Sequence, residues 1–166
     1  MGFKKSYLPA ACLAAVLLMA GCRGHKEVSG TWPNYEFGTS YVNASPSGEV
    51  TLRSWGSGPN KSEAIEAAMK NAVNDVIFKG IKGGKGYMSQ PIVTEVNARE
   101  RYAAYFDRFF ADGGEYKRFV KETSGSDMSR TKSKSDGREN FGVTVTIDRP
   151  ALVRQLREDN VIITVR

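Results

Sequence analysis

The sequence contains few of the residues that bind transition metals, form disulfides or act as general bases. Among its 166 residues are two cysteines, Cys12 and Cys22, and a single histidine, His25. A zinc site needs several Cys, His, Asp or Glu side chains around one ion, and a Ser or Cys nucleophile usually needs a base beside it. We therefore expect no metal site, no catalytic residues and no cofactor, and we expect that the chain is not an enzyme.

Long apolar runs are also missing. The apolar residues 8–20 fall short of the roughly 20 residues that a membrane-spanning helix needs. They follow Lys4 and Lys5, and the small residue Gly21 comes directly after them. A basic start, a short apolar core and small residues before a cleavage point are typical of a secretory signal. We expect residues 1–21 to be a signal peptide.

The end of this segment reads Leu18-Met19-Ala20-Gly21-Cys22. It resembles the lipobox of bacterial lipoproteins, in which Leu and two small residues precede a lipidated Cys; here Met19 takes the place of the Leu. The resemblance implies that the thiol of Cys22 receives a diacylglycerol and anchors the chain in a membrane. Each buried methylene contributes about 0.8 kcal/mol, and two or more acyl chains give stable anchoring.

The residues after Cys22 indicate which membrane is involved. In the lipoprotein family, an Asp after the lipidated Cys retains many proteins at the inner membrane, whereas this chain has Arg23. The resemblance therefore implies the outer membrane. Surface-exported lipoproteins often carry an acidic run after the Cys, and residues 23–27 have no such run. We expect a periplasm-facing position.

Residues 22–48 are interpreted as a lipidated tether, because they are rich in glycine, serine and proline. Several aromatic side chains interrupt this composition: Trp32, Tyr35, Phe37 and Tyr41. They favour packing of part of the tether on its own domain or on a partner. Residues 49–166 are expected to form one domain.

The clearest predicted element is a helix over residues 61–79. Asn60 and Glu63 have the spacing of a capping box, and Gly80 follows the expected end. Apolar residues at three- and four-residue spacing form one stripe, namely Ile65, Ala68, Met69, Ala72, Val73, Val76 and Ile77. Asp75 is expected to lie off this stripe.

Strands are expected on both sides of this helix. Alternating apolar residues predict a strand over residues 50–53, ending in a turn at 55–59, and a second strand over residues 140–147. We also expect a short or irregular strand within residues 87–96. The chain is expected to end in a strand over residues 161–165.

Further helices are expected over residues 98–111 and after Asp148. Asn97 would cap the first, whose broad aromatic face consists of Tyr102, Tyr105, Phe106, Phe109 and Phe110. Asp148 would cap the second, with Pro150 tolerated in its first turn. Residues 115–123 suit either a short helix or a strand. Together the elements predict a single α+β domain, with helices packed on one face of a small, mostly antiparallel sheet.

Two parts of the sequence resemble a known envelope module. The first runs from Trp55-Gly56-Ser57-Gly58 to Glu63-Ala64, Ala68 and Ala72, and the second comprises Val143, Val145, Ile147, Asp148, Leu152 and Leu156. This pattern is similar to the family of outer-membrane-associated lipoproteins related to the amino-terminal domain of flagellar assembly protein T. The resemblance implies an α+β domain that acts by binding in envelope assemblies, without catalysis.

The charge pattern leaves more than one interpretation open. Basic residues outnumber acidic residues by 24 to 18, which favours anionic partners or simply solubility, and export argues against nucleic acid. Residues 124–138 are interpreted as a polar hairpin loop that is either solvated or in contact with anionic lipid or glycan. Its basic residues are Arg130, Lys132, Lys134 and Arg138. The glycine-rich residues 80–86 lack the spacing of a P-loop and are interpreted as a surface turn.

Three hypotheses of function follow. The leading one is a membrane-anchored envelope lipoprotein that acts as a non-enzymatic binding or assembly module for envelope proteins. The second is a surface-exposed lipoprotein that binds glycan or another ligand through Trp32, Trp55 and tyrosines. The third is an enzyme with a carboxylate pair, which requires a cleft holding two acids about 5–10 Å apart.

Replacing Cys22 with alanine tests the proposed anchor. Without the thiol there is no site for the acyl chains, so we expect an uncleaved or mislocalised precursor. Membrane fractionation and intact-mass measurement report the outcome. A Cys22→Ala chain that matures and fractionates normally with the membrane would contradict the lipobox interpretation.

Overall fold

The computed structural model describes residues 38–84, 86–123, 129–132 and 138–162. This part of the chain forms an α+β domain, as predicted, with five strands in one sheet. The strands are β1 (Ser40–Ala44), β2 (Val50–Gly58), β3 (Val120–Glu122), β4 (Ser129–Lys132) and β5 (Glu139–Ile147). The α-helices are α1 (Lys61–Phe78), α2 (Ala98–Arg101), α3 (Ala103–Phe109) and α4 (Arg149–Glu158), and 3-10 helices cover Gly86–Ser89 (η2) and Glu115–Arg118 (η3).

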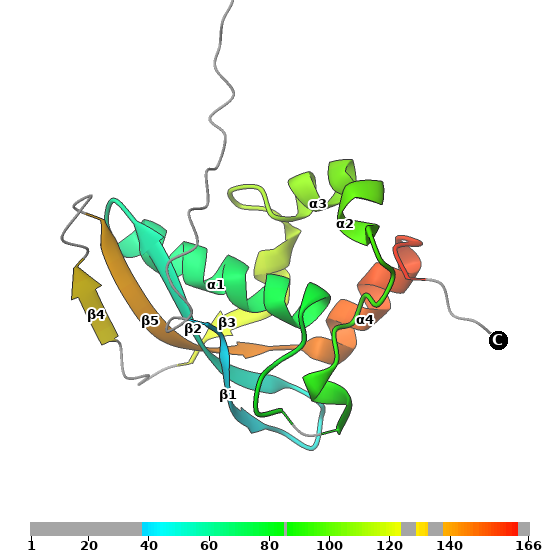
Figure 1. Ribbon diagram of the computed structural model, residues 1–166, viewed down its shortest axis with the longest axis horizontal. Coiled ribbons are helices and arrows are strands. Elements are labelled where there is room, and N and C mark those ends of the chain that lie inside the picture. Colours follow the sequence, from blue (N-terminus) through cyan, green and yellow to red (C-terminus); the bar gives the residue numbers. More distant parts are fainter. Residues whose placement is uncertain (1–37, 85, 124–128, 133–137, 163–166) are drawn as a thin grey trace, which may run out of the picture. The chain divides into compact units, whose positions relative to one another are not determined.

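The sheet is organised around β5, and every named pair of strands is antiparallel. One edge of β5 pairs with β2 along its whole length, from Glu139 opposite Gly58 to Ile147 opposite Val50. The other edge pairs with β3 near Ile147 and with β4 near Glu139. Strand β1 extends the sheet beyond β2 (Figure 1). The strand predicted over residues 140–147 is thus confirmed.

Two predicted boundaries are wrong because strand pairing extends further than the local sequence pattern indicates. Residues 55–58 continue β2 instead of forming a turn, since their backbone pairs with the first half of β5. Strand β1 lies inside the predicted tether 22–48 and pairs with β2, so the folded part begins before Glu49. Tyr41, one of the aromatic residues of that segment, packs partly against the core.

Helix α1 confirms its predicted capping. The side-chain oxygen of Asn60 accepts a hydrogen bond from the Glu63 N–H at 3.0 Å, and the Asn60 amide donates to the Glu63 carboxylate at 2.8 Å. Gly80 has φ +73°, a conformation that favours glycine, and its N–H donates to the Asp75 carbonyl. The Asp75 side chain, however, is buried instead of exposed, and it pairs with Lys79 at 2.9 Å.

Helix α1 lies against β2 at backbone contact. A Cβ atom on Gly56 would stand 2.2 Å from the carbonyl oxygen of Ala64, and one on Gly58 would stand 2.6 Å from the Ala64 nitrogen. The helix residues that face the sheet are small and fully buried, among them Ala64, Ala68 and Ala72. Glycine on the strand and alanine on the helix therefore allow an approach that any larger side chain would prevent.

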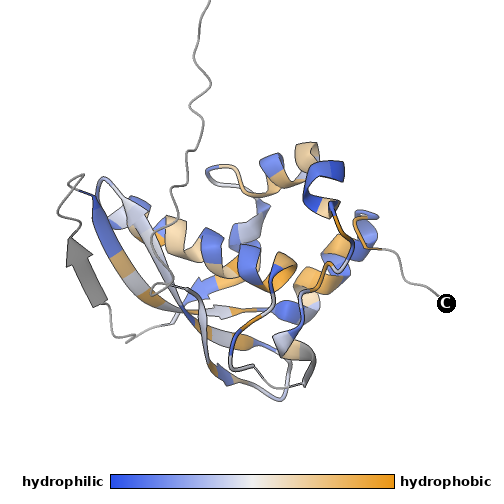
Figure 2. Cartoon of the chain, viewed as in Figure 1, coloured by the Kyte–Doolittle hydropathy of each residue, from blue (hydrophilic) through white to orange (hydrophobic). Residues whose placement is uncertain are grey.

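The helices pack on one face of the sheet, as predicted, and α1 lies along it (Figure 1). Apolar and polar residues alternate along β5 (Figure 2), which places Val143, Val145 and Ile147 in the core. The other face carries a hydroxyl ladder in which Thr146 contacts Thr51 at 3.2 Å and Thr123 at 3.1 Å. This alternation sets a polar face against an apolar one, as expected for a half-buried antiparallel sheet.

The strand predicted within residues 87–96 is absent. Helix η2 occupies its beginning, and the N–H groups of Ile92 and Val93 then donate to the carbonyls of Val76 and Ile77 at 3.1 and 2.9 Å. These carbonyls belong to the last turn of α1, which leaves its final carbonyls without helical partners. Residues 92 and 93 are thus hydrogen-bonded to the end of α1 and do not pair with the sheet.

The predicted helix 98–111 is broken into α2 and α3 at Tyr102. Asn97 has φ +65° and its side chain makes no capping hydrogen bond, so the predicted cap is wrong. Helix α3 turns Phe106 and Phe109 into the core. Burial of these rings takes precedence over the continuous helical periodicity of the sequence.

The last part of the chain follows the prediction only in part, because residues 129–132 of the predicted polar loop 124–138 form β4 and pair with β5. Residues 115–123 contain both a short helix, η3, and a strand, β3. The Asp148 carboxylate accepts a hydrogen bond from the Ala151 N–H at 2.9 Å and caps α4, with Pro150 in the first turn. Val161 is buried but belongs to no strand, and residues 163–165 of the predicted last strand lie outside the described part.

Gly56→Ala is expected to destabilise the domain by at least about 2 kcal/mol, because the new methyl group would collide with helix backbone that has little room to move. The free energy of unfolding from urea titration measures this loss. Gly38→Ala is the matched control, since a Cβ atom there has nothing within 4 Å. Equal stability of the two variants would contradict the close approach of α1 to β2.

Candidate functional site

Most residues that the sequence analysis singled out do not gather in one place. Cys22, His25 and Trp32 lie outside the described residues. Trp55 belongs to β2, where its ring lies over Gly142 on the polar face of the sheet: a Cβ atom on that glycine would stand 2.8 Å from the ring. The basic loop contributes β4, and Gly80–Gly84 form a turn that follows α1.

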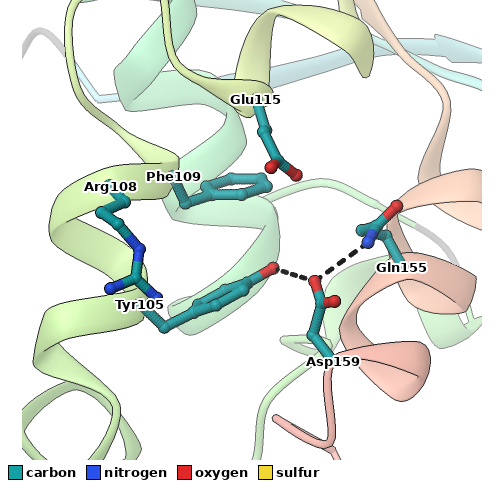
Figure 3. Close-up of a pocket in the computed structure, with 6 residues that line it drawn as sticks. All are labelled: Tyr105, Arg108, Phe109, Glu115, Gln155 and Asp159. Carbon is teal, nitrogen blue, oxygen red and sulfur yellow. Dashed lines mark hydrogen bonds between the residues drawn. The ribbon is translucent and has the colours of Figure 1, made fainter.

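A pocket of about 310 Å³ lies where α3, η3 and α4 meet (Figure 3). Its lining residues are Tyr105, Arg108, Phe109, Glu115, Gln155 and Asp159. The volume is at the lower end of the range of about 300–1,000 Å³ that is usual for small-molecule sites. The lining combines two aromatic rings with three charged groups and one amide, so it can hold a ligand through both stacking and charge.

The aromatic wall of this pocket is fixed by ring contacts that reach into the core. The rings of Tyr105 and Phe109 are stacked with centroids 5.8 Å apart, and Phe109 stacks on Phe119 at 6.0 Å. Phe106 meets Phe78 of α1 edge to face at 4.8 Å. The aromatic face predicted for this helix is divided in the structure: Phe106 and Phe109 are buried, whereas Tyr102, Tyr105 and Phe110 are half-buried. Tyr105 and Phe109 line the pocket.

Asp159 connects α3 with α4. Its Oδ2 atom accepts hydrogen bonds from the Tyr105 hydroxyl at 2.7 Å and from the Gln155 amide at 3.0 Å (Figure 3). Burial raises the pKa of Tyr105 well above its usual value, and the hydrogen bond and the negative charges of Asp159 and Glu115 raise it further. The phenol therefore stays protonated and keeps donating to the carboxylate.

The charges around the pocket are incompletely neutralised. Glu115 pairs with Arg118 at 4.0 Å, at the limit of an ion pair, and both side chains are more than half exposed. The two donors to Asp159 are neutral groups. Within the described residues, Arg108 forms no ion pair or hydrogen bond. An incoming ligand can thus meet one cation and two anions in the same pocket.

The carboxylate hypothesis requires a cleft that contains two acids. Glu115 and Asp159 meet this requirement to the extent that both line one pocket. Sequence reasoning could not pair them, because they lie in η3 and directly after α4, far apart along the chain. Among the six lining residues there is no Ser, Thr, Cys, His or Lys. The lining offers groups for stacking, hydrogen bonding and charge recognition, and its two carboxylates are also of the type that acts in acid–base chemistry.

A second polar cluster lies between α1 and η3. The buried Tyr116 hydroxyl donates to Glu66 at 2.8 Å, and Lys117 pairs with the same carboxylate at 3.0 Å. The hydrogen bonds from Tyr116 and Lys117 lower the pKa of Glu66 below its usual range. Lys70 pairs with Asp112 at 2.7 Å. Because each charge has a partner, we interpret this cluster as the contact that holds η3 on α1.

The described part of the chain contains neither a cluster of metal ligands nor a membrane-spanning helix. No group of three or more His, Cys, Asp or Glu residues there is arranged to hold a metal ion. None of the helices in the same residues combines the length and the apolar character that crossing a membrane requires.

Alkaline pH is expected to destabilise the domain through Tyr105 and Tyr116. Burial is the main cause that raises the pKa of both phenols, and hydrogen bonds to Asp159 and Glu66 add to it. Since the folded pKa exceeds the unfolded one, this stabilisation is complete below about pH 10 and is lost as the pH rises further. Urea midpoints measured across this range should fall more steeply for the natural chain than for the Tyr105→Phe/Tyr116→Phe variant. Parallel curves would contradict the expectation.

Comparison of the chain with protein-family models, with curated proteins and with solved structures finds no match. The resemblance to the lipobox and to the envelope module therefore rests on the quoted residues alone.

Proposed function

We propose that this chain is a membrane-anchored envelope lipoprotein that acts as a non-enzymatic binding or assembly module. The anchor is the lipid on Cys22, preceded by the signal peptide 1–21. Arg23 after the lipidated residue favours the outer membrane, and the lack of an acidic run favours the periplasmic side. The folded domain that follows supplies the binding surface.

The pocket between α3, η3 and α4 is the observation that carries the binding role. Its wall is preformed, because ring stacking fixes Tyr105 and Phe109 and two hydrogen bonds fix Asp159. Preformed concave sites with aromatic walls and a few convergent polar groups are typical of ligand binding. The lining offers aromatic, charged and hydrogen-bonding groups that can hold a ligand, and Ser, Cys, His and Lys are missing from it, which favours binding over acyl transfer.

Membrane anchoring supports a binding role because it raises the effective concentration of the domain near its partners. A domain tethered to a membrane is confined to a thin layer, so its effective concentration near partners in that layer rises without any new contact. The expected partners are the membrane itself, through the acyl chains, and envelope proteins. Nucleic acid is not an expected partner for an exported chain.

The alternative is a surface-exposed lipoprotein that binds glycan or another extracellular ligand. The same pocket favours it, because the half-buried Tyr105 ring beside carboxylate and amide groups suits a sugar ring with its hydroxyls. Protease treatment of intact cells separates the two positions. A periplasm-facing domain should resist until the outer membrane is permeabilised, whereas immediate cleavage would favour surface display.

Site-specific crosslinking in cells tests the assembly role. A photoreactive residue at Glu158, exposed on α4 beside the pocket, should repeatedly capture one envelope protein, while the same residue at the exposed Lys121 of β3 should not. Mass spectrometry identifies the adducts. Equal capture of abundant neighbours from both positions, in cells that express the protein well, would contradict an assembly role and favour the glycan- or ligand-binding alternative.

A further inference from the structure

The charges of the pocket are separated across its aromatic wall. In Figure 3 the carboxyl groups of Glu115 and Asp159 lie on one side of the pocket, and the Arg108 side chain lies on the other. The Tyr105 ring stands between Arg108 and Asp159 and is held there by its hydrogen bond to the Asp159 carboxylate. A ligand placed over the ring would therefore have negative groups at one end and a guanidinium at the other.

The acidic side of the pocket suits a positively charged group. Asp159 uses Oδ2 for both of its hydrogen bonds, from Tyr105 and from Gln155, so its second oxygen remains an available acceptor. Glu115 has its weak contact with Arg118 at 4.0 Å, and its side chain is 58% exposed. An ammonium group beside these carboxylates would also lie close to the Tyr105 ring, and aromatic faces attract cations.

The basic side of the pocket suits a carboxylate. Arg108 lies exposed in the last turn of α3, and within the described residues it is not engaged by an acid. A guanidinium presents its N–H groups in a planar fork that matches both oxygens of a carboxylate. Arg108 would also repel a purely cationic ligand from its side, which adds selectivity to the affinity supplied by the acids.

We propose that this pocket binds a zwitterion of the amino-acid class, with its ammonium group held by Glu115 and Asp159 and its carboxylate held by Arg108. The ligand is an amino acid in which the bound ammonium and the bound carboxylate lie at opposite ends of the carbon chain, because the two acids and Arg108 lie on opposite sides of the pocket. The pocket of about 310 Å³ has room for such a ligand, and the ring of Tyr105 contacts its aliphatic part. This inference names the ligand class of the binding function proposed above and rests on that function.

Three compounds that share the same central carbon segment separate the contributions of charge. Diaminopimelic acid carries ammonium and carboxylate groups at both ends, pimelic acid lacks the amines, and cadaverine lacks the carboxylates. Titration of the full chain in detergent, followed by backbone amide NMR, should show saturable shifts around the pocket with diaminopimelic acid. Pimelic acid and cadaverine should bind at least about tenfold more weakly, because each loses one charged contact.

Substitutions that remove a charge but keep the side chain similar in size test which residue binds the ammonium group and which binds the carboxylate. Glu115→Gln and Arg108→Gln should each weaken the binding of diaminopimelic acid about fivefold or more, with Arg108→Gln removing the preference over cadaverine. Glu122→Gln is the matched control, since it removes an exposed acid of β3 that does not line the pocket, and its affinity should stay within about twofold of the natural chain.

Several outcomes would overturn the proposal. These are no saturable shift at the pocket, shifts confined to another surface, or cadaverine binding as tightly as diaminopimelic acid. Because the purified chain is used, none of these results depends on lipidation or on membrane position. Capture of an envelope protein from Glu158 together with absent zwitterion binding would leave the assembly role in place and reject this ligand class alone.

Discussion

The contact of α1 with β2 is the constraint on which the rest of the structure depends. Gly56 and Gly58 expose the strand backbone, and Ala64 and Ala68 bring the helix backbone down onto it, close enough that a Cβ on either glycine would overlap helix atoms. Close packing of this kind leaves no freedom in the position of the helix. Strands β3 and β5 and helix η3 also pack against this helix.

The position of α1 decides where the aromatic segment can lie. Its flank binds η3 through Tyr116, Glu66 and Lys117, and its last turn captures the backbone of residues 92 and 93. The chain between these two attachments must cross the end of the helix, and it does so as α2 and α3 with the phenylalanine rings turned inward. Tyr105 is left partly outside this core and becomes one wall of the pocket.

The opposite wall of the pocket is formed by α4, the helix that follows β5. Strand β5 leads directly into α4 through the Asp148 cap, and Leu152 and Leu156 fix the helix on the core. Asp159 follows its last turn and meets the Tyr105 hydroxyl. The pocket is thus formed by segments that are distant in sequence but are each anchored independently, which is the preorganisation that binding of a small ligand requires.

The sequence by itself determined those features that depend on neighbouring residues. The Asn60 and Asp148 caps, the helix after Asn60 and the alternating strand 140–147 follow from hydrogen bonds and side-chain periodicity within a few positions. The lipobox proposal rests on the same kind of local pattern around Cys22. Tertiary structure alone decided the length of β2, the strand in the predicted tether and the break at Tyr102. The length of β2 depends on pairing with β5, the strand in the predicted tether depends on pairing with β2, and the break at Tyr102 depends on burial of Phe106. It alone also brought Glu115 and Asp159 around one pocket, because side chains so far apart along the chain share a site only after the sheet and α1 have positioned them.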